Sequence, residues 1–361
     1  MVEPAQRFAD PRADASSGRS WAMRMGRALA FGGGEPDAAV VALAGFLLRG
    51  GVVLLALPSA VLPSVIGIAG VTGIDAVGID GRPTPWLFEI VAIFGGAVIL
   101  WLALASLIGS LIDVWLIEAT VDATDRSVRR GRSLPEVGLL LDMVAVRGIC
   151  LLPLAGALAW ASTRVYTVAY NELTTPSNLA TPLPVRIVEN AADAVVVVAL
   201  VWLVTETVAA LAVRRLVLAD GGVWASIAGM LVQIVRRPLS TVSTAVATTG
   251  ASVLATAVAL AATATAFDWC RIAARNQQPI VISLGYGPLS TTRDFRPIVF
   301  VLAALLLATA WVAAAALSGI ASACRSAAWT GEVMTSLSGA QAGPAAAKLG
   351  LSGGTGERSG D

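Results

Sequence analysis

The chain has 361 residues and a mean hydropathy of +0.77; 56% of its residues are hydrophobic and only 14% are charged. Soluble domains average about 25% charged residues, so this composition excludes an ordinary soluble protein and indicates one embedded in lipid. The net charge of +1 argues against nucleic acid as a partner. The chain has no histidine, the commonest metal ligand and general base. We therefore expect no enzymatic activity, no metal and no cofactor.

The two ends of the chain differ in composition from its middle. Residues 1–36 carry several arginines among small residues and contain no apolar core of a signal peptide, and residues 336–361 are rich in glycine, alanine and serine. Both compositions are typical of disordered segments. We predict disordered cytoplasmic tails over 1–36 and 336–361, on either side of a transmembrane domain over 37–335.

Six hydrophobic segments in the middle of the chain are long enough to cross a membrane. They lie at about 50–71, 88–117, 148–170, 190–213, 239–266 and 298–320. These runs are continuous, whereas the strands of a membrane β-barrel alternate between apolar and polar residues. Backbone in hydrocarbon must satisfy its own hydrogen bonds, so the runs predict helices. The predicted fold class is therefore all-α, a polytopic membrane protein with six transmembrane helices.

The six segments recur as three similar units, each with an arginine before its first span and a tryptophan in its second. The arginines are Arg49, Arg147 and Arg236, and the tryptophans are Trp101, Trp202 and Trp311. This internal repeat predicts three repeated hairpins.

A short apolar stretch precedes the arginine of each unit, at about 37–48, 135–146 and 223–235. Each is too short to span a membrane, and we interpret them as short helices lying at the interface or packed under the bundle. Alternatively, each stretch forms only the first turns of the span that follows it. For the first stretch the two interpretations stay open. The second and third contain polar residues (Glu136, Asp142 and Gln233) that favour the interfacial one.

Positive charge is distributed unevenly between the two sets of loops that the spans define. Of the 25 lysines and arginines, 7 lie on one side: Arg82, Arg164, Arg186, Arg271, Arg275, Arg293 and Arg296. The other 18 lie on the side that includes both ends of the chain. Because lysine and arginine accumulate on the cytoplasmic side, we predict a multi-pass protein of the cell membrane with both termini in the cytoplasm.

Four charged residues within the even-numbered spans or just beyond their ends are the candidates for function. Asp113 and Arg214 each follow the tryptophan of their unit by 12 residues, and Arg325 follows its own by 14. If the hairpins are related by symmetry, Asp113 lies at the same depth as both arginines and forms a charge cluster with one of them. Glu206 is the deepest of the four. Charges in spans usually face the bundle interior or a water-filled cavity; the alternative is structural pairing, or snorkelling of the arginines to the headgroups.

Two segments, RRLVLADGGVWASIAGMLVQIVRRPLSTVSTAV and ASACRSAAWTGEVM, carry a resemblance to known proteins. With the layout of residues 37–335, they resemble a group of poorly characterised six-span bacterial membrane proteins. The group includes the membrane domain appended to some glycerophosphodiester phosphodiesterases. In that group a short helix with an arginine enters the next span in the same way. The resemblance implies a six-span domain, and no catalytic residue is carried over because no hydrolase domain accompanies it here.

These expectations together describe an integral membrane protein that acts as a lipid-associated, scaffold or accessory component. Its expected partners are membrane lipids, not nucleic acid. The alternative function is a small transporter or channel with a polar path at Glu206 and Asp113. A polar cavity that reaches Glu206 would favour the alternative.

Overall fold

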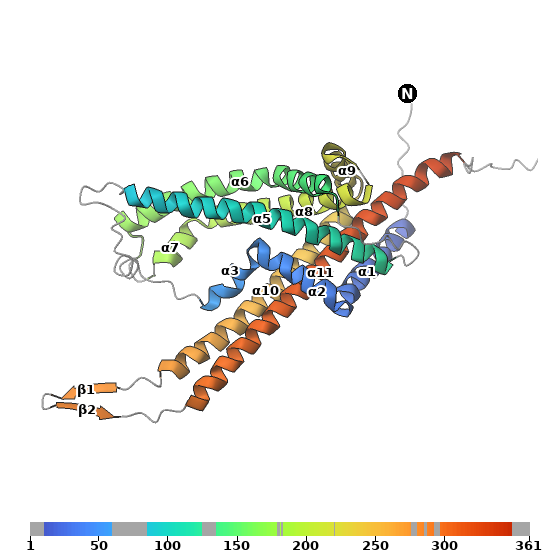
Figure 1. Cartoon of the computed structure of the whole chain (residues 1–361). Coiled ribbons are helices and arrows are strands. Elements are labelled where there is room, and N and C mark those ends of the chain that lie inside the picture. The colour runs from blue at the N-terminus through green and yellow to red at the C-terminus, as the bar shows by residue number, and fades with distance from the viewer. Residues whose placement is uncertain are drawn as a thin grey trace, which may run out of the picture. The chain divides into compact units, whose positions relative to one another are not determined.

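Figure 1 shows the computed structural model of the chain. It describes residues 11–59, 85–124, 135–178, 181, 183–219, 221–275, 280–284, 287–291 and 297–348. In chain order the elements are α1 (Pro11–Gly34), α2 (Pro36–Phe46), η1 (Leu47–Gly51), α3 (Val52–Ala56), η2 (Leu57–Ser59), α5 (Pro85–Thr124), α6 (Val137–Thr174), α7 (Leu183–Asn190), α8 (Ala192–Ala219), α9 (Val223–Arg236), α10 (Pro238–Arg275), β1 (Ile280–Leu284), β2 (Gly287–Thr291) and α11 (Pro297–Lys348). The described chain is all-α apart from one short antiparallel hairpin of β1 and β2.

Six helical stretches among the described residues are long and apolar enough to cross a membrane. They are Pro36–Ser59, Ala92–Thr124, Val137–Glu172, Ala192–Ala219, Pro238–Ala274 and Ile298–Ser338. This confirms the predicted class, a polytopic all-α membrane protein. The first stretch begins earlier than the predicted span over 50–71, and residues 60–71 of that span lie outside the described residues.

Two of the three short apolar stretches form helices that end at or near an arginine. α2 is followed by a kink at Arg49 and Gly50, where Gly50 has a φ of 100°, and α3 continues beyond it. α9 ends at Arg236, and Arg237 has the non-helical angles φ −135° and ψ 56° before Pro238 begins α10. A residue before proline is disfavoured in the helical region, which explains the second break.

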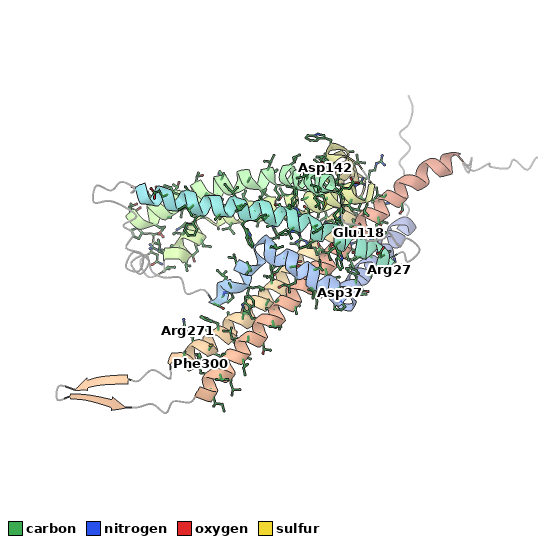
Figure 2. All side chains as sticks on the ribbon, viewed as in Figure 1. Arg27, Asp37, Glu118, Asp142, Arg271 and Phe300 are labelled. Atoms are coloured by element: carbon green, nitrogen blue, oxygen red, sulfur yellow. The ribbon has the colours of Figure 1, made fainter. Side chains whose placement is uncertain are left out.

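The second stretch, 135–146, differs from the prediction. The interpretation of 135–146 as a short helix separate from the span is wrong. From Val137 onward these residues form the first turns of the span, within the single helix α6, which was the alternative interpretation. Neither Gly148 nor Pro153 ends the helix. Asp142 lies on α6 toward the end near α9, as Figure 2 shows, and its side chain is exposed. The three-hairpin repeat stays a prediction.

The predicted tails also differ from the structure. Residues 11–34, within the expected disordered segment 1–36, form the helix α1. Residues 336–348, within the expected disordered segment 336–361, continue α11. Both corrections have the same cause: small residues such as alanine, abundant in these segments, are compatible with a helix as well as with disorder.

The chain divides into two compact units. The first comprises Met1–Phe31, Ile117–Thr249 and Arg325–Asp361, and the second comprises Gly32–Leu116 and Gly250–Cys324. In the first unit α6 and α8 run side by side, with α7 near one end of the pair and α9 near the other (Figure 1). Its buried apolar side chains include seven from α6, α8, α9 and α11: Met143, Val146, Leu211, Val213, Met230, Trp329 and Val333.

In the second unit α10 and α11 form a helical pair that leads into β1 and β2 (Figure 1). Figure 2 shows Arg271 and Phe300 toward the strand end of this pair. A small core of Leu55, Ala259 and Ala314 joins α3 to both helices, and the indole N–H of Trp311 donates to the carbonyl oxygen of Leu55 at 3.2 Å. At Gly319 a β-carbon would lie 2.6 Å from the carbonyl oxygen of Ala39. Only glycine therefore allows α2 and α11 to approach so closely.

Candidate functional site

Glu206 and Arg325, two of the four predicted candidates, contact each other in the first unit. Arg325 Nη2 on α11 donates to Glu206 Oε1 on α8 across 3.1 Å. The side chains are 23% and 36% exposed, respectively. Lipid would leave an isolated carboxylate strongly destabilised, and Arg325 supplies the counter-charge for Glu206.

Asp113, the third candidate, pairs with an arginine that was not predicted as its partner. Arg49 Nη2 donates to Asp113 Oδ2 at 2.7 Å and to the carbonyl oxygen of Gly109, one turn earlier on α5, at 3.0 Å. The kink at Arg49 and Gly50 thus brings the guanidinium to α5 within the second unit. A β-carbon on Gly109 would lie 3.2 Å from this guanidinium, so a glycine at 109 gives the arginine room.

Arg214, the fourth candidate, is buried in the first unit on α8. It donates to the carbonyl oxygen of Ala210 at 2.9 Å and to the hydroxyl oxygens of Ser326 and Thr330 on α11 at 3.2 and 3.3 Å. The guanidinium of Arg214 therefore donates to oxygen atoms on both α8 and α11. Because Asp113 belongs to the other unit, its predicted cluster with Arg214 or Arg325 stays a prediction.

One deeply buried ion pair of the first unit is not among the residues predicted from the sequence. Glu332 on α11 is fully buried, and its carboxylate accepts hydrogen bonds from Arg24 on α1 and Ser240 on α10, both at 2.9 Å. One turn along α10, the hydroxyl of Thr244 accepts a hydrogen bond from the indole of Trp21 on α1 at 3.1 Å. We call these five residues the Glu332 cluster.

The sequence does contain a signal for this contact. Trp21, Arg24, Ala28 and Phe31 are spaced by three or four residues, which places them on one stripe of a helix. Ala28 and Phe31 are buried. The stripe was overlooked because the surrounding arginines, glycines and alanines suggested disorder.

A second missed group surrounds Arg215, the neighbour of Arg214. Arg215 Nε donates to Gln233 Oε1 on α9 at 3.0 Å, and its Nη2 donates to Ser336 Oγ on α11 at 3.1 Å. Ser336 Oγ lies 3.0 Å from the same Gln233 oxygen. We call Arg215, Gly229, Gln233 and Ser336 the Arg215 site, since Gly229 lies against the same guanidinium.

A third polar group closes the opposite end of α6 in the first unit. The buried carboxylate of Glu172 accepts from Arg186 on α7 and from Asn190, each at 2.9 Å, and from the backbone N–H of Ser177 at 3.1 Å. These bonds fasten the turn between α6 and α8. We assign this group a structural role, because each oxygen of the carboxylate already has a donor.

No family model, curated protein or solved structure matches this chain. The resemblance to six-span bacterial membrane proteins therefore stays an expectation.

The described sites offer hydrogen bonding and charge pairing. Among the described residues, no group of three or more histidine, cysteine, aspartate or glutamate side chains is placed to hold a metal ion. The carboxylates Asp113, Glu206, Glu172 and Glu332 each contact an arginine. Each of these four carboxylates is thus paired with an arginine of its own unit, whereas Arg215 contacts the neutral side chains of Gln233 and Ser336.

Proposed function

We propose that this integral membrane protein is a non-enzymatic, lipid-associated scaffold or accessory component of the cell membrane, with both termini in the cytoplasm. The observation that supports the proposal is how little of the spans the chain itself covers. In the most apolar part of each span, between 6% and 28% is buried inside the protein. The remaining apolar surface needs lipid or another protein against it, because exposure to water is unfavourable.

The matched charges favour the same function. Releasing Glu206 from Arg325 to bind a transported ion would leave an arginine without its counter-charge among apolar helices. Breaking such a pair is strongly unfavourable where the groups are withdrawn from water. A scaffold needs no release, and the pair then serves to hold α8 against α11.

The alternative is a small transporter or channel with a polar path at Glu206 and Asp113. The observation that favours this alternative is the exposure of Glu206, whose side chain is 36% exposed. A substrate able to reach this carboxylate would compete with Arg325.

Two measurements on the purified chain separate these functions. The first is the phospholipid that stays bound through purification in a mild detergent, measured as organic phosphorus per protein; we expect several molecules per chain. The second is flux of small ions and protons in proteoliposomes, compared with empty liposomes and with a Glu206→Gln variant. A scaffold gives no flux above empty liposomes. Flux that Glu206→Gln abolishes would replace the proposal with the transporter alternative.

A further inference from the structure

Arg215 carries a positive charge that the described chain does not balance. It lies near the end of the span Ala192–Ala219 and is partly buried. Its contacts, Gln233 Oε1 and Ser336 Oγ, are neutral, and it has no carboxylate partner among the described residues. Arginines withdrawn from water in proteins are normally paired with a carboxylate or a phosphate.

The Arg215 site is also short of hydrogen-bond acceptors. Gln233 is 2% exposed, and its Oε1 receives Arg215. Since a guanidinium can only donate, this contact fixes the orientation of the amide. The opposite amide nitrogen, Nε2, is then a buried donor with no partner among the described residues. Buried donors are nearly always satisfied by protein, water or ligand, so the site calls for an acceptor beyond the described residues.

Gly229 leaves space for the guanidinium at this place. A β-carbon at 229 would lie 2.6 Å from Arg215 Nη1, closer than any real contact of that kind. Gly229 and Gln233 are one turn apart and so present the same face of α9 to Arg215. Nη1 has no hydrogen bond to a described residue, which leaves it able to donate to a ligand.

The outer face of α9 is apolar, and its inner face carries two buried polar side chains. Trp224, Leu231 and Val235 share one face and are 73%, 55% and 79% exposed, whereas Ser226 and Gln233 on the other side are buried. α9 has 14 residues and directly connects two spans, α8 and α10. It is too short to cross a membrane itself. The environment that suits an apolar outer face between two spans is lipid, with α9 lying along the membrane surface.

Two further arginines stand at the end of α9. Arg236 is exposed, and Arg237 donates to the carbonyl oxygen of Thr335 at 3.3 Å. Neither has a carboxylate partner among the described residues. Basic groups between helices at the cytoplasmic end of a bundle attract anionic lipid headgroups. Arg236 and Arg237 thus add positive charge beside the Arg215 site, which has too few acceptors and no carboxylate among the described residues.

We infer that the Arg215 site binds the phosphate of an anionic phospholipid headgroup, while the apolar face of α9 lies among the acyl chains of the same leaflet. Arg215 supplies charged N–H donors, and Gly229 provides room for them. The inference rests on the proposed lipid association and names the lipid class and the residues that select it. Inorganic phosphate shares the same chemistry, so the test separates the two sources.

The test titrates the full-length chain in detergent with three probes: dioctanoyl phosphatidylglycerol, dioctanoyl phosphatidylcholine and inorganic phosphate. Binding is followed by native mass spectrometry. Arg215→Gln removes the charge, and Arg27→Gln is its control, because Arg27 is an exposed arginine of the same unit. Gly229→Ala displaces the flexible guanidinium and keeps its charge. Gly250→Ala is its control, because a β-carbon there meets nothing within 4 Å.

We expect phosphatidylglycerol to bind the wild type about tenfold more tightly than phosphatidylcholine. Arg215→Gln should weaken phosphatidylglycerol binding about tenfold, which is the size of one charged hydrogen bond. Gly229→Ala should weaken it several-fold, and both controls should stay within about twofold. If Arg215→Gln does not fold, Gly229→Ala carries the test, since it preserves every charge.

Three results would overturn the inference. In the first, phosphatidylglycerol binds the Arg215→Gln variant as tightly as the wild type. If that variant does not fold, equally tight binding to a folded Gly229→Ala variant has the same meaning. In the second, the wild type does not distinguish the two lipids. In the third, inorganic phosphate binds as tightly as the lipid, which would assign the site to free phosphate. In each case, retention of phospholipid by the purified wild type leaves the proposed function standing, whereas its loss removes the proposed function as well.

Discussion

Glu332 has the most demanding environment of the carboxylates described above, because its side chain is fully buried and Arg24 is 15% exposed. Glu332→Gln keeps the shape and the contact with Ser240 but leaves the arginine without its counter-charge. Removing one member of a buried pair is destabilising by about 3–5 kcal/mol, and the small exposure of Arg24 lowers our expectation to about 2–4 kcal/mol. Thermal unfolding of the purified chain in detergent measures this loss.

Asp268→Asn is the control for this prediction. Asp268 lies 3.9 Å from Arg271, and both side chains are about half exposed, so its replacement should change stability by less than about 1 kcal/mol. The pairwise role is tested with Arg24→Leu and Glu332→Leu, which together should lose less than the sum of the single losses. Strict additivity would mean that the 2.9 Å contact contributes nothing.

Asp113 allows the structure and the sequence prediction to be compared directly. The contact of 2.7 Å with Arg49 predicts that Asp113→Asn and Arg49→Gln are coupled by about 1 kcal/mol, since Arg49 is 40% exposed and its charge is partly screened. The predicted cluster requires similar coupling between Asp113→Asn and Arg325→Gln. Free energies of unfolding are measured for the single and double variants of both pairs. Additive losses for Asp113→Asn and Arg49→Gln would contradict the structure, and additive losses for Asp113→Asn and Arg325→Gln would rule out the predicted cluster.

At the scale of elements, the kink between α2 and α3 depends on Gly50. Its φ of 100° lies in the left-handed region that residues with a side chain rarely adopt. Gly50→Ala should therefore destabilise the chain by about 1–2 kcal/mol, and Gly148→Ala is the matched control, because Gly148 follows an arginine inside the uninterrupted helix α6. The control should be neutral or stabilising by up to about 1 kcal/mol. Equal effects of the two changes on the unfolding temperature would contradict the kink.

Much of the element layout could be predicted from the sequence, because hydropathy over 20 residues reports directly on membrane-spanning length. The helix breaks could not. The same Arg–Gly pair occurs at 49–50 and at 147–148, yet only the first interrupts a helix. Glycine permits both conformations, and the choice depends on surroundings. At Gly51 a β-carbon would lie within 2.4 Å of the ring of Phe46, a contact that hydropathy does not reveal.

The candidate site could be predicted only in part, because its contacts also depend on surroundings that hydropathy does not reveal. Glu206 and Arg325 stand out as charges within apolar runs, but they are 119 residues apart, and their pairing follows only from the packing of α8 on α11. Arg24 and Glu332 are 308 residues apart. Arg24 lies in a segment whose composition is typical of disorder, so the sequence gives no indication of its partner. Pairings of this length depend on helix rotation and depth, which composition does not determine.

At the scale of the whole molecule, the account rests on six span-capable stretches among the described residues and on a strong bias in arginine placement. A membrane protein in which Asp113, Glu172, Glu206 and Glu332 each contact an arginine of the same unit, and whose spans leave most apolar surface uncovered, suits a scaffold in lipid. That account requires the loops after α6 and after α10 to lie on one side of the membrane and the end of α11 to lie on the other.

Cysteine accessibility tests this topology most directly. The native cysteines Cys150, Cys270 and Cys324 are first replaced by alanine, and single cysteines are then placed at Ser177, Ser290 or Ser352. A membrane-impermeant maleimide is applied to intact cells. The account predicts labelling of the first two positions and labelling of the third only after the membrane is opened. Labelling of Ser352→Cys in intact cells, or different behaviour at positions 177 and 290, would contradict the six-span topology.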